Sequence, residues 1–163
     1  MSAMKAQTRL QPAPDFTLPD EEGRPVRLAD LLDRGPILLL FYRGDWCSYC
    51  NAQLAGYALR HRELDALGAQ VLAISVDGQP DAAALKTKLR FPFPVLSDPS
   101  HAVIDRYGGI EARLRQGIAI GKPATYVLDR EGRIRWSYVG EDFADRPLVE
   151  EVIDQVRLAA ADA

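Results

Sequence analysis

Cys47 and Cys50 are the only cysteines of the chain, and they stand three positions apart in the segment 41–54, FYRGDWCSYCNAQL. Cysteines at this spacing serve as a metal clip, a structural staple or a working redox pair. At the first turn of a helix their Cα atoms would lie about 5–6 Å apart, within reach of a disulfide. Main-chain N–H groups at a helix start also stabilise a thiolate, which is the reactive form of cysteine.

Metal binding and haem attachment fit the pair less well than redox chemistry. A zinc site needs four ligands, and the only histidines, His61 and His101, are too far apart in sequence to make a close ligand pair. Haem attachment needs a histidine directly after the second cysteine, where this chain has Asn51. We therefore predict a redox pair with no metal and no cofactor, and an inert buried pair remains the alternative.

Composition places the chain among ordinary globular proteins. Its 163 residues are 47% hydrophobic and carry a formal net charge of −3, which suits one domain with a sizeable core. An acidic balance argues against nucleic acid as a partner. The longest apolar run, 37–42, is too short to span a membrane, and residues 1–14 lack the apolar region of a secretory signal. We expect no membrane association and a cytoplasmic location.

The elements around the pair follow an alternating order. The continuous apolar run at 37–42 is typical of a strand buried on both faces. Apolar residues at helical spacing follow the pair and end at Gly68, so we expect one helix that begins at the cysteines. Further expected elements are a short helix at 28–35, strands at 69–76 and 91–99, helices at 80–90, 100–109 and 147–160, and a hairpin at 124–140. This order predicts an α/β fold with a central mixed β-sheet flanked by helices.

Four segments in order resemble the peroxiredoxin-like family, the alkyl hydroperoxide reductase C and thiol-specific antioxidant (AhpC/TSA) group of thioredoxin-fold proteins. They read PAPDFTLPDEEGRPVRLADLL, LLLFYRGDWCSYC, FPVLSDP and PATYVLDREGRIRWSYVG, and the resemblance covers about 10–160. It implies a thioredoxin-like fold of the peroxiredoxin type with an N-terminal extension. We divide the chain into a flexible tail, 1–11, and a single domain, 12–163.

The resemblance also implies an enzyme, a thiol peroxidase that reduces hydroperoxides through Cys47 and Cys50. Its reductant would be a thioredoxin-, glutaredoxin- or glutathione-type thiol, and the protein would be a monomer or homodimer. Two alternatives remain open, a protein disulfide oxidoreductase and a redox sensor without turnover.

Three positions depart from the family pattern Pro-x-x-x-Thr/Ser-x-x-Cys. Its last cysteine, which attacks the peroxide, corresponds to Cys50. Cys47 occupies the threonine position and Arg43 the proline position. The family's arginine, which stabilises thiolate and peroxide before the strand that begins ATYVLD, is replaced by Pro123.

The departures resemble thioredoxin, in which Trp-Cys-x-x-Cys follows the strand and a cis-proline faces it. Trp46, Cys47, Cys50 and Pro123 match those places, so we predict a cis peptide bond at Pro123 that exposes a docking surface. The two resemblances name different nucleophiles. We expect Cys50 to attack hydroperoxides and Cys47 to attack disulfides.

Nearby side chains complete the predicted site. Arg43 is a predicted catalytic residue that replaces the missing arginine and favours the thiolate, and Lys122 is a second candidate for this role. Trp46, Tyr49 and Lys122 are predicted to bind substrate. The alternative for Arg43 and Lys122 is an ordinary surface charge.

Overall fold

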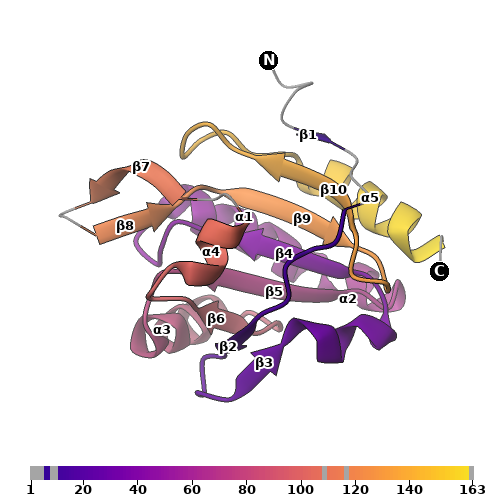
Figure 1. Ribbon diagram of the computed structural model, residues 1–163, viewed down its shortest axis with the longest axis horizontal. Coiled ribbons are helices and arrows are strands. Elements are labelled where there is room, and N and C mark those ends of the chain that lie inside the picture. The colour runs from indigo at the N-terminus through magenta and orange to yellow at the C-terminus, as the bar shows by residue number, and fades with distance from the viewer. Residues whose placement is uncertain (1–5, 8–10, 108–109, 116–117, 162–163) are drawn as a thin grey trace.

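The computed structural model describes residues 6–7, 11–107, 110–115 and 118–161, and it contains a mixed sheet with layers on both faces (Figure 1). The sheet has six strands in the order β1-β10-β9-β4-β5-β6. Their bounds are β1 Ala6–Gln7, β4 Ile37–Phe41, β5 Gln70–Ser75, β6 Val95–Ser97, β9 Ala124–Leu128 and β10 Ile134–Val139. The predicted α/β, thioredoxin-like fold class is confirmed.

Strand β4 lies at the centre of the sheet, parallel to β5 and antiparallel to β9. Its five residues are all buried, because successive side chains of a strand point to opposite faces and both faces are covered. Leu38 and Leu40 belong to one hydrophobic cluster, and Leu39 and Phe41 belong to the other. Burial on both faces explains the continuous apolar run of the sequence.

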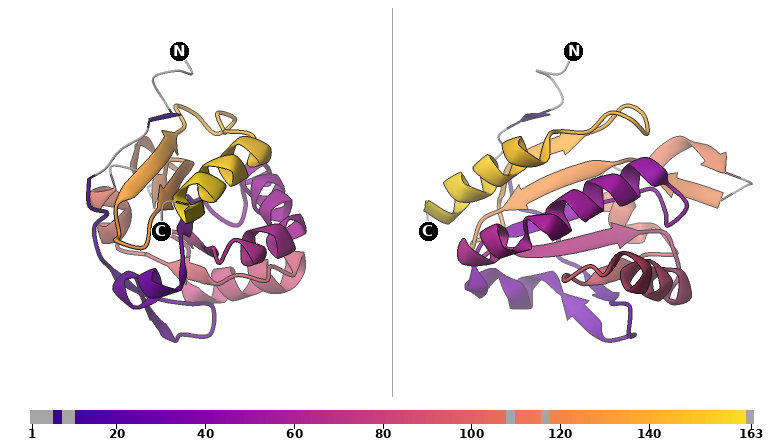
Figure 2. Two further views of the ribbon diagram at one scale, coloured as in Figure 1. Left: turned by 90° about the vertical axis from the view of Figure 1, so that its right-hand side faces the viewer. Right: turned by 180° about the vertical axis from the view of Figure 1, so that it is seen from behind.

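The two faces are covered by different elements (Figure 2). On the face of Leu38 lie α1 Ser48–Leu59, α2 His61–Ala66, α3 Gln79–Leu89 and α5 Val149–Ala161. On the opposite face lie α4 Ala102–Arg106, the 3₁₀ helix η2 Leu28–Arg34, and the hairpin of β2 Thr17–Pro19 and β3 Pro25–Arg27. The first of these layers holds both cysteines.

Two elements differ from their predicted form. The single helix expected up to Gly68 is divided into α1 and α2, because Arg60 leaves helical geometry with φ −100° and ψ 15°. The segment after α4 forms an antiparallel hairpin, β7 Ile110–Arg115 with β8 Ile118–Gly121, which the sequence did not reveal. None of the described helices has the length and apolar character needed to cross a membrane.

The predicted flexible tail, 1–11, lies mostly outside the described residues. Within it, Ala6 and Gln7 pair with Tyr138 and Ser137, so β1 adds a short edge strand beside β10.

Strand register brings four chain segments to one edge of the sheet. Phe41, at the end of β4, pairs with Ile74 of β5 and with Ala124 at the start of β9. Ala124 in turn pairs with Val139 at the end of β10. The loop that carries the cysteines, the loop after β5, Pro123 and the loop 140–148 therefore meet at this edge.

Candidate active site

Cys47 caps the N-terminus of α1. Its backbone is extended, with φ −87° and ψ 108°, and its Sγ accepts a hydrogen bond of 3.3 Å from the main-chain N–H of Cys50. Serine, threonine, aspartate or asparagine usually fills this role, so a cysteine here presents its sulfur to the positive end of the helix. The predicted position of the pair at a helix start is confirmed.

Cys50 lies one turn deeper and receives two N–H donors. The main-chain N–H of Arg43 lies 3.3 Å from Cys50 Sγ, and the guanidinium Nη2 of Arg146 lies 3.0 Å from it. Cys50 is 0% exposed and Cys47 is 4% exposed, and both are free thiols. A substrate therefore reaches Cys47 before Cys50, and only a small one reaches either without a local movement.

Arg146 comes from the loop between β10 and α5, and sequence reasoning missed it. Besides Cys50, its Nη2 lies 3.8 Å from Cys47 Sγ. Its Nη1 donates to Gln53 Oε1 at 2.6 Å, and its Nε donates to the carbonyl of Phe143 at 2.9 Å. All three guanidinium nitrogens thus have acceptors, which fixes the plane of the group against the two sulfurs.

The pKa values of the two thiols are shifted in opposite directions. The pKa of Cys47 falls to about 5, first because the Cys50 thiol donates a hydrogen bond to its sulfur. The Cys50 main-chain N–H, Arg146 and Arg43 lower this pKa further, while burial opposes them. The same hydrogen bond and then burial raise the pKa of Cys50 far above its ordinary value, against Arg146 and the Arg43 N–H. At neutral pH the pair therefore holds one proton and one negative charge.

Arg43, a predicted catalytic residue, makes contacts at the site through both its main chain and its side chain. Its main chain contacts Cys50, and its guanidinium lies over the rings of Trp46 and Phe143, 4.9 and 5.6 Å from their centroids. Tyr49 packs edge-on against Phe143, with the centroids 5.2 Å apart. Trp46 and Tyr49, which are predicted to bind substrate, are exposed to solvent. Phe143 is a third exposed aromatic residue in this group, and sequence reasoning missed it.

The prediction for the Pro123 peptide bond is wrong, because the described residues contain no cis bond. Pro123 instead supports the neighbouring loop: its carbonyl accepts a hydrogen bond of 2.8 Å from Gly140 N–H. Lys122 is half-buried, and no contact to either sulfur is found for it among the described side chains.

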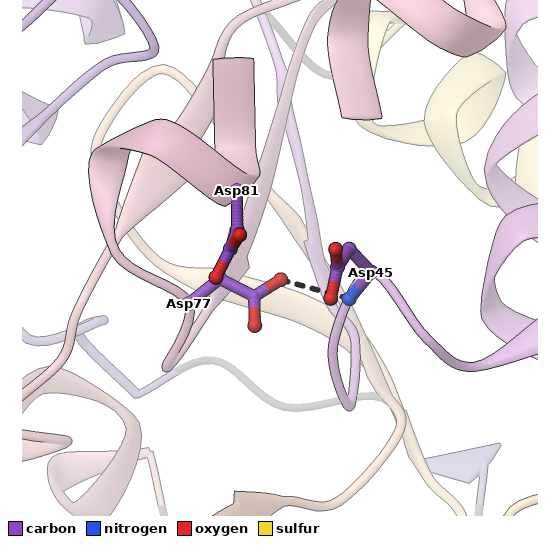
Figure 3. A group of neighbouring side chains, drawn as sticks. All are labelled: Asp45, Asp77 and Asp81. Atoms are coloured by element: carbon purple, nitrogen blue, oxygen red, sulfur yellow. Dashed lines mark hydrogen bonds between the residues drawn. The ribbon is translucent and has the colours of Figure 1, made fainter. Parts of the chain in front are cut away.

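Asp45, Asp77 and Asp81 form a group of three neighbouring carboxylates (Figure 3). Asp45 precedes α1, Asp77 follows β5, and Asp81 lies on α3; oxygen atoms of the three lie within 4.8 Å of one another. Asp77 accepts the main-chain N–H of Asp45 at 2.8 Å, which ties the loop carrying Cys47 to β5. Oxygen ligands of this kind suit a hard cation, but no second feature of the described residues indicates an ion here.

Asp77 also titrates close to neutral pH. Burial raises the pKa of its carboxyl to about 6, and the carboxylates of Asp45 and Asp81 act in the same direction, while the Asp45 N–H opposes them. We infer that the three carboxylates help to hold the loop before α1 in place, through the hydrogen bond between Asp45 and Asp77.

The chain is similar to proteins of one family along most of its length. The model of the AhpC/TSA family matches residues 10–137. Over 126 residues the chain is 34% identical to the chloroplastic peroxiredoxin Q of Oryza sativa subsp. japonica, a match that covers 77% of this chain and 56% of the relative. It is 33% identical over 126 residues to a Coxiella burnetii protein assigned the name peroxiredoxin bcp, covering 76% and 83%.

Among solved structures, peroxidoxin BcpB from Mycobacterium tuberculosis is 25% identical, with a TM-score of 0.82 over 93% of this chain and 97% of that one. The match thus spans just over half the length of the rice relative and nearly all of the mycobacterial one.

Proposed function

The chain belongs to the AhpC/TSA family, the peroxiredoxin-like group of thioredoxin-fold proteins, and we propose that it is a thiol-dependent peroxidase. It reduces hydroperoxides through a dithiol–disulfide cycle of Cys47 and Cys50. The observation that carries the proposal is the thiol pair at the start of α1, where the main-chain N–H of Cys50 reaches Cys47 Sγ and the guanidinium of Arg146 contacts both sulfurs.

In the first step Cys50 attacks the terminal oxygen of the hydroperoxide. Cys47, the resting thiolate, takes the proton of Cys50 as the S–O bond forms and the O–O bond breaks. The departing alkoxide receives that proton from Cys47 and leaves as an alcohol. Cys50 becomes a sulfenic acid, so the sulfur has lost the two electrons that the peroxide gained.

In the second step the Cys47 thiolate attacks the sulfur of the Cys50 sulfenic acid. The S–S bond forms, the S–O bond breaks, and the hydroxide that leaves takes a proton from solvent to become water. A thioredoxin-, glutaredoxin- or glutathione-type reductant then returns two electrons and two protons and is itself oxidised to a disulfide. Cys47 releases one of these protons to solvent, which restores the resting thiolate. A reducing compartment such as the cytoplasm supplies such thiols.

Two observations favour a hydroperoxide over a protein disulfide as the oxidant. Cys47 and Cys50 are only 4% and 0% exposed, which admits a small molecule more readily than a protein chain. The trans bond at Pro123 also removes the docking surface that a cis-proline would have provided.

The test is peroxide consumption by the wild-type protein, Cys47→Ser and Cys50→Ser with each of the three reductant types. We expect continuous turnover by the wild type only, because each variant lacks one half of the disulfide. A wild-type protein that consumes no peroxide faster than the reductant alone, yet reduces protein disulfides, would overturn the proposal.

A further inference from the structure

A hollow of about 500 Å³ opens between the C-terminal half of α3 and the turn that joins β2 to β3, and neither cysteine lines it. Both of these elements lie next to β6, the last strand of the sheet (Figure 1). Sites for small molecules in proteins have volumes of about 300–1,000 Å³. The hollow is therefore large enough to take a small organic molecule.

The walls of this hollow are held together by buried contacts. The buried carboxylate of Glu21, in the β2–β3 turn, accepts hydrogen bonds from Lys86 Nζ at 2.8 Å and from the main-chain N–H of Val95 at 3.3 Å. Phe91 is buried and stacks on Phe93, with the ring centroids 5.0 Å apart. Because turn, helix and strand are joined in this way, the hollow keeps its shape without a ligand.

The charges that line the hollow cancel except for one. Glu21 pairs with Lys86 at 2.8 Å, and Glu22 pairs with Arg24 at 3.0 Å. Arg90 also lines the hollow and is exposed, and no acceptor for its guanidinium is found among the side chains and main-chain groups that the structure describes. The hollow thus presents one unpaired positive charge.

The backbone of Arg90 is strained. Arg90 ends α3 in the left-handed region, with φ 53° and ψ 45°. Glycine usually takes this conformation at the end of a helix, because a Cβ makes it unfavourable. Favourable interaction with the helix dipole does not require this arginine, since Lys86 and Lys88 already place two cations in the last turn. An arginine kept in a strained conformation points to a role for its side chain.

We propose that the hollow binds a small organic monocarboxylate. The carboxylate pairs with the guanidinium of Arg90, which can donate two parallel hydrogen bonds to it, and the apolar part of the ligand lies toward Ala83 and Phe91. A phosphate ester, with nearly two negative charges, fits less well because only one cation is unpaired and the carboxylates of Glu21 and Glu22 line the same hollow. This site does not depend on the reaction of the thiols.

The test is an NMR titration of the isotope-labelled full chain with three probes of similar size. Phenylacetate is the monocarboxylate, phenylethanol its neutral analogue, and phenyl phosphate the doubly charged analogue. The variants are Arg90→Gly, which removes the guanidinium and suits the left-handed backbone, and Arg90→Lys. Lys88→Met is the matched control, because it removes a cation from the same turn of α3 that does not line the hollow.

We expect phenylacetate to give saturable shifts of the amide signals of Glu21, Lys86, Arg90 and Phe91, with a Kd in the millimolar range. Arg90→Gly should weaken binding by about 10-fold or more, the usual effect of losing a hydrogen bond to a charged group. Its melting temperature should be no lower than that of the wild type, since glycine relieves the strain. Arg90→Lys should bind with intermediate affinity, and Lys88→Met should match the wild type. Phenylethanol and phenyl phosphate should bind more weakly than phenylacetate.

The proposal is overturned if phenylacetate gives no saturable shifts at the hollow, or if Arg90→Gly binds it as tightly as the wild type. Equal affinity for phenylethanol would show that the hollow is only an apolar surface. Tighter binding of phenyl phosphate would show that the ligand class is wrong. Peroxide consumption is not measured in this test, so its outcome is independent of the proposed peroxidase activity.

Discussion

The guanidinium of Arg146 donates a hydrogen bond to the sulfur of Cys50 although 96 positions separate the two residues in sequence. The contact depends on the pairing of Phe41 with Ala124 and of Ala124 with Val139, which places the loop after β10 above the start of α1. A candidate site that looks local in sequence is thus completed by a distant loop.

Cys47 and Cys50 are predicted to form a reversible disulfide with each other. The main-chain N–H of Cys50 already reaches the sulfur of Cys47, so little backbone motion separates the dithiol from the disulfide. Mass spectrometry of the protein after mild oxidation should show a monomer lighter by two hydrogens, and a thiol reductant should restore the mass. A disulfide-linked dimer as the main product would contradict this pairing.

The Cys47→Ser variant is predicted to accumulate a sulfenic acid at Cys50 under limited peroxide. The chain has no third cysteine to resolve the intermediate. A dimedone-type probe followed by peptide mapping should place the label on Cys50, and Cys50→Ser is the matched control. A label found on Cys47 in Cys50→Ser and absent from Cys47→Ser would make Cys47 the nucleophile for peroxides, as its low pKa allows.

Local patterns revealed the fold and half of the site. The apolar run that forms β4, the Cys-x-x-Cys spacing and the turn at 129–132 are signals within a few residues, and each is confirmed by the structure. The division of the helix at Arg60 was missed, because the apolar spacing continues across it.

The other half of the site depends on register between strands that are distant in sequence. Arg146 on a polar loop resembles any solvated surface charge, and Gln53 resembles ordinary helix surface. One signal was available: in a thioredoxin-like sheet the loop after the hairpin's second strand returns to the edge where the central strand ends. A basic residue in that loop could therefore have been considered in place of Lys122.

Asp77 is predicted to make stability depend on pH between about 4 and 6. Burial raises the pKa of its carboxyl from 3.8 to about 6 in the folded chain, so over this range the folded state holds a proton that the unfolded state has lost. The free energy of unfolding should therefore fall as the pH rises through this window. Asp77→Asn keeps an oxygen for the Asp45 N–H and removes the titration.

Chemical denaturation from pH 4 to pH 7 measures this effect. After allowance for solvent screening, Asp77→Asn should be more stable than the wild type by about 1 kcal/mol at pH 7, with no gain at pH 4. Asp81→Asn, which removes an exposed carboxylate from the same group, is the matched control. An equal stability difference at both pH values would show that Asp77 does not titrate in this window.

Gly140→Ala is predicted to displace Arg146 from the sulfurs. A Cβ at position 140 would overlap the main-chain oxygen of Asp145 and would lie 3.0 Å from Cγ of Pro123, so the loop must shift at the residue before Arg146. Overpacking of this kind costs about 1–3 kcal/mol of stability. Because the shift is transmitted to the guanidinium, the pKa of the first thiol to titrate should rise, as expected when a cation moves away from a thiolate.

The matched control for this change is Gly78→Ala, where a Cβ would make only an ordinary contact, 3.7 Å from Cδ of Pro80. Gly78 precedes α3, so its substitution tests the general effect of losing a glycine near the same edge of the sheet. We expect Gly78→Ala to keep the wild-type thiolate titration, peroxide kcat/KM and, within about 0.5 kcal/mol, stability. Both variants are compared well below their melting temperatures, so that a lower kcat in Gly140→Ala reports the displaced loop rather than unfolded protein. If Gly140→Ala is as stable and as active as Gly78→Ala, then the loop tolerates the methyl group, and the packing of Gly140 against Asp145 and Pro123 does not hold Arg146 in place.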